Sequence, residues 1–497
     1  MKNLKRMNKI YHAGYPVLLL MAFMLNVAIP PVDTFAQIEN KYLVSVDELG
    51  VVSSGLIAAG LTAAGVYDPG KTINDVSIYK ITYHTINVFG DPTIASGAMY
   101  VPQTGADSIP LILYQHGTVM KKSQVPSERA EDPPGLFYSG YGYIVAMSDY
   151  LGLGDNPGQH PYLHWESEAT ASIDLLRAAR EFLNDSLGIS DDQLFLAGYS
   201  QGGHATMAVH KYIQVNNLQS EFRIVASAPM SGPYSLSYAQ FDHIFSQDST
   251  YTGSYFIPYI ISSYQYVYGN LYSDPEEYYD PPYDSIFTAW EASGNFFDNY
   301  PIESFPKNIY DFMQDSVVDQ ILQDPNHPLR LDLRENDLYN WAPQEPVRMI
   351  YCGMDMTVAA ANATSTQDSM LLLGAPDVLA VNVVPEYNHT TCAIPAFLYA
   401  FDWFDSFLIN HSVNTSDVPA GPVVSIYPNP VNTLLTVETG IPGTYLVEIH
   451  SVNGQLVYSR NLEDDVQRID FSSFRKGVYL ITIRSKDFIA TRRVIKL

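Results

Sequence analysis

Residues 194–204 read LFLAGYSQGGH, an apolar run that breaks at a serine flanked by glycines. The run is typical of a short buried strand, Leu194–Ala197, which must turn sharply into the helical pattern that follows. Gly198 and Gly202 leave room for the neighbouring backbone because neither carries a Cβ. Ser200 is then expected at the apex, beside a helix N-terminus that favours developing negative charge. The motif predicts a serine nucleophile for acyl transfer; the alternative is a glycine-rich turn with an incidental serine.

The turn at Ser200 is called the nucleophile elbow below. The strand before it is one of a series of apolar strands that alternate with helical patterns, and this alternation predicts a doubly wound, mostly parallel α/β sheet covered on both faces. A helix is expected near Ser45–Ala64, where Ser45 and Glu48 have capping-box spacing. An antiparallel pair, 77–87 and 95–101, is expected to lead into the sheet. Further strands are predicted at 111–115, 143–147, 194–197, 223–228, 347–351 and 378–384, and helices at 166–183, 205–213 and 393–408.

The α/β pattern is interrupted between residues 235 and 345, too long a stretch for an ordinary loop. Tyrosine is frequent in its first half. Aromatic side chains supply the apolar area that disordered segments lack, so a folded cap over the active site is expected. The tyrosines suggest a cleft suited to short, medium or aryl esters, unless they pack the core of the cap itself.

The two ends of the chain differ from the middle. Basic residues, the apolar run 17–29 and the small residues at 34–36 predict a signal peptide, residues 1–36. The run is short for a bilayer span, so no transmembrane anchor is expected after cleavage. The mature catalytic domain is predicted at 37–410, a polar linker at 411–422 and a seven-stranded β-sandwich at 423–497.

The formal net charge of −26 is concentrated between residues 37 and 422. Such a surface repels polyanions, so no nucleic-acid partner is expected, although acidic surfaces also keep exported proteins soluble. No metal-binding or nucleotide-binding motif is present in the sequence, and no cofactor is expected. The two cysteines, Cys352 and Cys392, are expected either to form one disulfide or to remain buried free thiols.

A serine hydroxyl needs a histidine base, and the histidine needs a carboxylate that orients it. His389 is the histidine that follows the last predicted strand of the α/β domain. Asp355 follows the strand that ends at Tyr351, whereas the fallback carboxylates Asp368 and Asp377 lie in a helical run and before a strand. The oxyanion hole is expected to take the backbone N–H of Gln201 and a donor from the turn at Gly117 and Thr118.

The large domain resembles an α/β-hydrolase, and more narrowly the secretory lipase family, whose fungal lipase-A-type members carry a cap before the acid-bearing strand. The resemblance covers nearly all of residues 75–405 and is carried by the following stretches: 81–85 (ITYHT), 95–97 (ASG), 115–117 (QHG), 148–154 (SDYLGLG), 160–163 (HPYL), 198–203 (GYSQGG) and 353–355 (GMD). It implies that Ser200, Asp355 and His389 form a catalytic triad and that the activity is hydrolysis of carboxylic esters, as in a carboxylesterase or lipase.

The C-terminal module resembles the type A sorting domain of the type IX secretion system. The matching residues are 427–430 (YPNP), 453–454 (NG), 476–479 (KGVY) and 492–496 (RRVIK). The resemblance implies a Gram-negative bacterium, passage through the periplasm, and an enzyme that is secreted or attached to the cell surface through residues 423–497. A carbohydrate-binding or adhesive β-sandwich is the alternative for this module.

Two other functions fit parts of the pattern. The glycine–serine motif also occurs in serine peptidases of the prolyl oligopeptidase type, which normally carry a large N-terminal propeller. A non-catalytic surface adhesin on a hydrolase fold is the second alternative. The predicted positions of all three triad residues favour an active ester hydrolase with a small-molecule or lipid ester as substrate.

Overall fold

The computed structural model divides into two compact units, Met1–Leu408 and Ile409–Leu497. The predicted signal peptide (1–36) and linker (411–422) lie outside the residues that the structure describes. Those residues are 42–129, 131–191, 193–245, 251–296, 300, 302–408, 425–438, 444–451, 456–462, 466–484 and 489–496.

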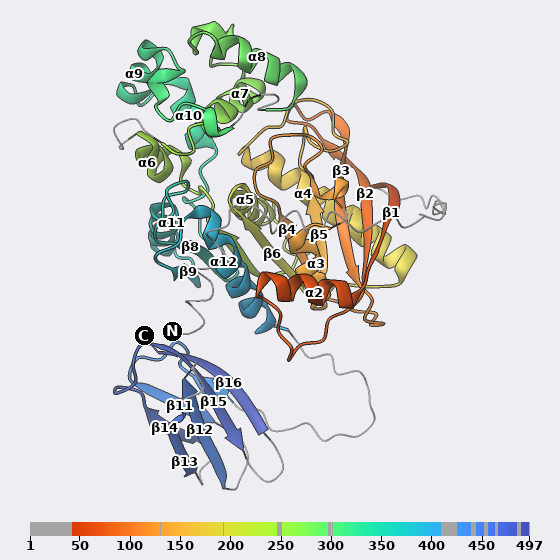
Figure 1. The fold of residues 1–497 in the computed structure, drawn as a ribbon, viewed down its shortest axis with the longest axis vertical. Coiled ribbons are helices and arrows are strands. Elements are labelled where there is room, and N and C mark those ends of the chain that lie inside the picture. The colour runs from red at the N-terminus through yellow and green to blue at the C-terminus, as the bar shows by residue number, and fades with distance from the viewer. Residues whose placement is uncertain are drawn as a thin grey trace. The chain divides into compact units, whose positions relative to one another are not determined.

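A nine-stranded sheet forms the centre of the first unit (Figure 1). The first four strands in spatial order pair antiparallel, and every later neighbour pairs parallel, which confirms the predicted mostly parallel α/β sheet with an antiparallel entry. In spatial order the strands are β1 (Leu43–Val52), β2 (Val76–Ile86), β3 (Pro92–Pro102), β5 (Ile144–Ser148), β4 (Leu111–Gln115), β6 (Leu194–Tyr199), β7 (Ile224–Met230), β8 (Val347–Cys352) and β9 (Val378–Val384).

Helices cover both faces of this sheet, and a separate apolar core lies under each layer. The central strands β4 and β5 are buried at every position, as expected for strands covered on two sides. One layer consists of α4 (Trp165–Phe182), α5 (Gln201–Val215) and α11 (Ala361–Leu372), and the other of α2 (Ser54–Ala64), α3 (Pro133–Gly140) and α12 (His389–Asp405).

The first predicted helix is wrong over its first half. Residues 45–52 belong to strand β1, which pairs antiparallel with β2 from Leu43 to Val52, and only α2 is helical. The capping-box spacing of Ser45 and Glu48 is a local preference, whereas β1 pairs with β2 along most of its length, interrupted by two register shifts. Ser53 instead caps α2, since its side chain accepts from the N–H of Leu56.

The insertion between β7 and β8 contains five α-helices in its described residues and has its own apolar core. Figure 1 shows α7 to α10, in green, as a separate layer at one side of the sheet. Aromatic rings dominate this core, which explains why a segment without α/β alternation nonetheless folds. The helices are α6 (Phe241–Phe245), α7 (Phe256–Tyr268), α8 (Tyr283–Ser293), α9 (Asp315–Gln323) and α10 (Pro328–Glu335).

The second unit is an all-β sandwich with an apolar core, as predicted. Seven strands form a three-stranded and a four-stranded sheet, and every neighbouring pair is antiparallel. The first sheet contains β10 (Ser425–Tyr427), β11 (Leu434–Glu438) and β14 (Val466–Asp470), and the second contains β13 (Leu456–Leu462), β12 (Tyr445–Ser451), β15 (Gly477–Arg484) and β16 (Ile489–Lys496).

Candidate active site

Ser200 occupies the sharp turn between β6 and α5. Its backbone has φ 62° and ψ −120°, a conformation that is strained for a residue with a Cβ. The turn is tightly enclosed: a Cβ on Gly202 would lie 2.0 Å from the carbonyl oxygen of Gln115, and one on Gly198 would lie 2.3 Å from that of Gly202. The glycines are therefore required, and the strain lifts the Ser200 hydroxyl above the carboxyl end of the sheet.

His389 lies within hydrogen-bonding distance of both Ser200 and Asp355. Its Nε2 is 2.9 Å from Ser200 Oγ, and its Nδ1 is 2.6 Å from Asp355 Oδ2. The other carboxylate oxygen of Asp355 accepts from the backbone N–H groups of Thr357 and Val358, at 3.0 and 2.8 Å. Because the carboxylate can only accept, Nδ1 carries the proton, and Nε2 is left to accept from the serine hydroxyl.

Two further contacts tie the loops that carry these side chains. Tyr199 donates its hydroxyl to the backbone carbonyl of His389, at 2.5 Å. Burial raises the pKa of Tyr199, so its hydroxyl remains a donor. Cys352, at the end of β8, forms a disulfide with Cys392, in the first turn of α12. The acid loop and the base loop are therefore joined covalently.

Gly117, Thr118 and Gln201 lie around Ser200. A Cβ on Gly117 would lie 3.9 Å from the Cβ of Ser200, and the Thr118 hydroxyl is 2.9 Å from the hydroxyl of Tyr162. Gln201 is the first residue of α5, so its backbone N–H has no partner within that helix. These positions suit backbone donors directed at an oxyanion on a Ser200 adduct.

The fallback carboxylates and two further histidines of the chain lie elsewhere. Asp368 is part of α11, and Asp377 pairs with Arg348 at 2.7 Å. His210 is buried in α5, where its Nε2 is 3.0 Å from Glu345. His411 lies outside the described residues.

A buried polar chain behind Ser200 was not foreseen. The Gln201 side chain contacts His160 and Glu168, and Glu168 in turn contacts His204. The segment 160–163 carries part of the family resemblance, but no role was predicted for it or for His204. A glutamate on the apolar face of the predicted helix 166–183 was the available indication of a buried partner.

A small cavity of about 30 Å³ adjoins Ser200 beneath the cap. Its lining is largely apolar and comes from the segment 162–163, from α6 and α7, and from residues next to Asp355; it includes Leu163, Leu236, Ile257, Ile260 and Val358. Only two tyrosines, Tyr162 and Tyr251, line it. The expectation of a tyrosine-rich cleft is therefore wrong, and its alternative holds, since most cap tyrosines lie in the core of the cap, as Tyr259, Tyr264 and Tyr279 do, or pack against it.

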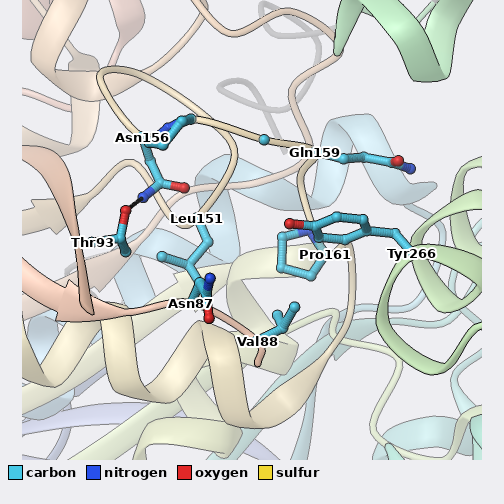
Figure 2. Close-up of a pocket in the computed structure, with 10 residues that line it drawn as sticks. Asn87, Val88, Thr93, Leu151, Asn156, Gln159, Pro161 and Tyr266 are labelled. Carbon is cyan, nitrogen blue, oxygen red and sulfur yellow. Dashed lines mark hydrogen bonds between the residues drawn. The ribbon is translucent and has the colours of Figure 1, made fainter. Parts of the chain in front are cut away.

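A second cavity, of about 190 Å³, is lined in part by the segment 156–161 (Figure 2). Tyr266 of α7 and Asn156 line it, whereas Ser200, Asp355 and His389 do not. Both polar atoms of the Asn156 side chain are already hydrogen-bonded within the protein: its amide donates to the carbonyl oxygen of Ile94 in β3 at 2.5 Å, and its oxygen accepts from the N–H of Gly152.

No helix within the described ranges is both long enough and apolar enough to cross a membrane.

Both units resemble known proteins. Residues 425–497 match the family model of the secretion system C-terminal sorting domain. None of the curated proteins compared with the sequence matches it.

Solved structures resemble the first unit. The ligand-bound form of the rice cell wall degrading esterase LipA from Xanthomonas oryzae is 30% identical, with 73% of this chain and 95% of that chain covered and a TM-score of 0.64. A putative hydrolase from Legionella pneumophila is 26% identical, with 75% and 100% covered and a TM-score of 0.67. Lipase A of Candida antarctica is 16% identical, with 76% and 85% covered and a TM-score of 0.56, a likeness of fold alone.

Proposed function

Since the chain belongs to the lipase and esterase family of α/β-hydrolases and ends in a type IX sorting domain, we propose that it is an exported serine hydrolase that cleaves carboxylic esters through an acyl-enzyme on Ser200. The observation that carries the proposal is the pair of contacts from His389, at 2.9 Å to Ser200 Oγ and 2.6 Å to Asp355 Oδ2. This is the arrangement that a general base between a nucleophile and an orienting carboxylate requires.

In the acylation step, Ser200 Oγ bonds to the ester carbonyl carbon while His389 Nε2 takes the hydroxyl proton. The carbonyl electron pair moves onto oxygen, where the backbone N–H of Gln201 and the turn at Gly117 and Thr118 supply donors. The C–O bond to the alcohol then breaks, and the departing oxygen takes the proton from His389. Asp355 stabilises the imidazolium that exists between the two proton transfers.

In the deacylation step, a water molecule takes the place of the alcohol. His389 takes a proton from this water as its oxygen bonds to the acyl carbon, and the proton then passes to Ser200 Oγ as the acyl bond breaks. The products are the free alcohol from the first step and a carboxylic acid from the second, and Ser200 is restored.

The cavity beside Ser200 supports short acyl groups as substrates. Its volume is only about 30 Å³, and its walls are largely apolar. An acetyl methyl group fits such a space, whereas a long chain requires the cap to move. The proposed substrates are therefore acetyl and other short-chain esters.

The test combines a substrate panel, a covalent probe and two variants. We expect nitrophenyl esters of two to four carbons to be cleaved with a higher kcat/KM than those of eight to sixteen. A fluorophosphonate should label Ser200. Ser200→Ala should lower kcat by about a millionfold, and adding His389→Ala should lower it little further, because triad members act as a unit.

Ser45→Ala is the matched control, because Ser45 is exposed on β1 far from the elbow in sequence. A Ser200→Ala variant that kept most of the activity would contradict the mechanism. Faster cleavage of a peptide anilide than of any ester would favour a peptidase, and a maximum at sixteen carbons would favour a long-chain lipase.

The sorting domain indicates that the protein is exported to the cell surface or the medium of a Bacteroidetes-type bacterium. We propose in addition that residues 1–36 direct the chain to the periplasm and that the type IX machinery recognises residues 423–497. The match of residues 425–497 to the sorting-domain model supports this route.

A further inference from the structure

The segment 160–163, His-Pro-Tyr-Leu, runs buried beside the nucleophile. His160 Nδ1 lies 2.8 Å from the carbonyl oxygen of Leu151, to which it donates its proton. Burial lowers the pKa of His160 to about 3, so the ring stays neutral and its Nε2 carries a free lone pair. That nitrogen is 2.9 Å from Nε2 of Gln201 and accepts from it.

Glu168 of α4 holds the same amide group from another side. Its Oε1 accepts from Gln201 Nε2 at 3.0 Å, and its Oε2 lies 2.7 Å from His204 Nδ1. The second nitrogen of His204 lies 3.2 Å from the carbonyl oxygen of Asn336. Glu168 and His204, both almost completely buried, thus contact each other behind Gln201.

The orientation of the Gln201 amide follows from these partners. His160 Nε2 and the Glu168 carboxylate are both acceptors, so the NH₂ end must face them. The amide oxygen is then left buried with no hydrogen-bond partner among the described residues. A buried unpaired oxygen is unfavourable, so the two contacts hold the side chain in one orientation against that penalty.

The same segment also reaches the other side of the site. The hydroxyl of Tyr162 is 2.9 Å from that of Thr118, in the turn expected to supply the second oxyanion donor. Ser263 of α7 clamps the segment, because its hydroxyl donates to His160 O at 2.9 Å and accepts from Tyr162 N–H at 3.0 Å. The segment therefore contacts both candidate donors, Gln201 through His160 and Thr118 through Tyr162.

We propose that His160 and Glu168 are positioning residues for the oxyanion hole. By fixing the Gln201 side chain they fix the first residue of α5, whose backbone N–H donates to the oxyanion. The inference rests on the proposed ester hydrolysis at Ser200. It predicts that losing the contact between His160 and Gln201 weakens binding of the transition state and leaves binding of the substrate nearly unchanged.

Two substitutions at one position separate the two hydrogen bonds of His160. Asn places its amide near the position of Nδ1, so His160→Asn keeps a donor for Leu151 and loses the acceptor for Gln201. Gln places its amide near the position of Nε2, so His160→Gln keeps that acceptor. We expect His160→Asn to lower kcat by about 10-fold to 100-fold with KM within twofold, and His160→Gln to recover kcat to within about threefold of the wild type.

The inhibition constant of phenylboronic acid distinguishes a positioning role from a merely structural one, because its adduct with a serine bears an oxygen in the oxyanion position. Its inhibition constant should rise in His160→Asn by the same factor by which kcat/KM falls. Tyr266→Phe is the matched control, because Tyr266 and Pro161 line the second cavity (Figure 2), which no triad residue lines, and the substitution should change neither value.

Equal kcat values for the Asn and Gln variants, or an unchanged inhibition constant in His160→Asn, would overturn the positioning role. If His160→Asn fails to fold, Gln201→Leu takes its place, since it removes the amide and keeps the backbone N–H; the same loss of kcat is expected, and wild-type kcat in that variant would overturn the inference. Activity retained by Ser200→Ala would instead refute the proposed function, so the two failures are distinguishable.

Discussion

At the scale of single residues, buried titratable side chains of the catalytic unit make its free energy of unfolding depend on pH. Burial, with a smaller contribution from His204, lowers the pKa of His164 to about 4. A histidine in the unfolded chain titrates near about 6.5, so between pH 6.5 and 4 the unfolded state binds more protons than the folded state. This contribution to the free energy of unfolding is complete above pH 6.5 and is lost as the pH falls to 4.

We therefore expect His164→Gln to be less sensitive to acid than the wild type. The difference in unfolding free energy between the two proteins should change by up to about 3 kcal/mol from pH 7 to pH 4. Urea unfolding of the catalytic unit at several pH values measures it. Burial raises the pKa of Asp132 and Asp149 to about 6, with the opposite effect on stability, but those residues are common to both proteins and cancel.

His84→Gln is the control for this comparison, because His84 is exposed on β2. Its pH dependence should follow the wild type. Parallel curves for His164→Gln and the wild type would show that His164 is not the proton-linked group.

At the scale of elements, the disulfide joins the end of β8 to the start of α12. Cys352 and Cys392 are 40 residues apart in sequence. Closing a loop of this length lowers the entropy of the unfolded chain, which stabilises the folded state by about 4 kcal/mol in the chain-entropy model. We expect the double variant Cys352→Ala, Cys392→Ala to lose about this much unfolding free energy in urea. A reductant should destabilise the wild type and leave the double variant unchanged; equal sensitivity would contradict the assignment.

Helix α7 contributes two isoleucines to the wall of the cavity beside Ser200. Ile257 and Ile260 both line it. Ile260→Ala should enlarge the acyl space and move the preferred nitrophenyl ester from two carbons to about four to six. It should also lower stability by about 2 to 4 kcal/mol, as large-to-small substitutions in cores do.

Ile261→Ala separates these two effects. Ile261 is fully buried on the same helix, in the core of the cap, and does not line the cavity. A similar loss of stability with no change in chain-length preference is expected. If both variants shifted the preference, general loosening of the cap rather than the cavity wall would be responsible.

At the scale of the whole molecule, catalysis and sorting are assigned to separate compact units. Each unit has its own apolar core, residues 42–408 in one and residues 425–496 in the other. A chain that ends at residue 410 should therefore keep kcat/KM within about twofold of the full-length enzyme. In a host with a type IX system, its activity should remain inside the cell instead of reaching the surface or the medium.

Full-length Ser200→Ala is the control for export, since it should be exported normally and be inactive. The location of both proteins can be followed with an antibody against the catalytic unit. Export of the truncated chain would show that residues 423–497 are not needed for sorting.

Several features of this protein follow from its sequence alone. Alternating apolar and helical patterns were enough to predict the parallel sheet, most of its covering helices and the β-sandwich, because hydrophobic periodicity is a local property of the chain. The elbow at Ser200 was readable for the same reason. His389 and Asp355 could be selected because the ends of parallel strands meet at one edge of a sheet, so position along the chain predicts position in space.

Only the folded chain decided which side chains meet across long separations in sequence. The strand β1 exists because β2 offers it a pairing edge, and the cap tyrosines turn inward because they pack on one another. The contacts among His160, Gln201 and Glu168 join three separate elements, and no periodicity encodes them. Local pattern determines which face of an element is buried, whereas the partner that each buried polar group finds depends on how the elements pack.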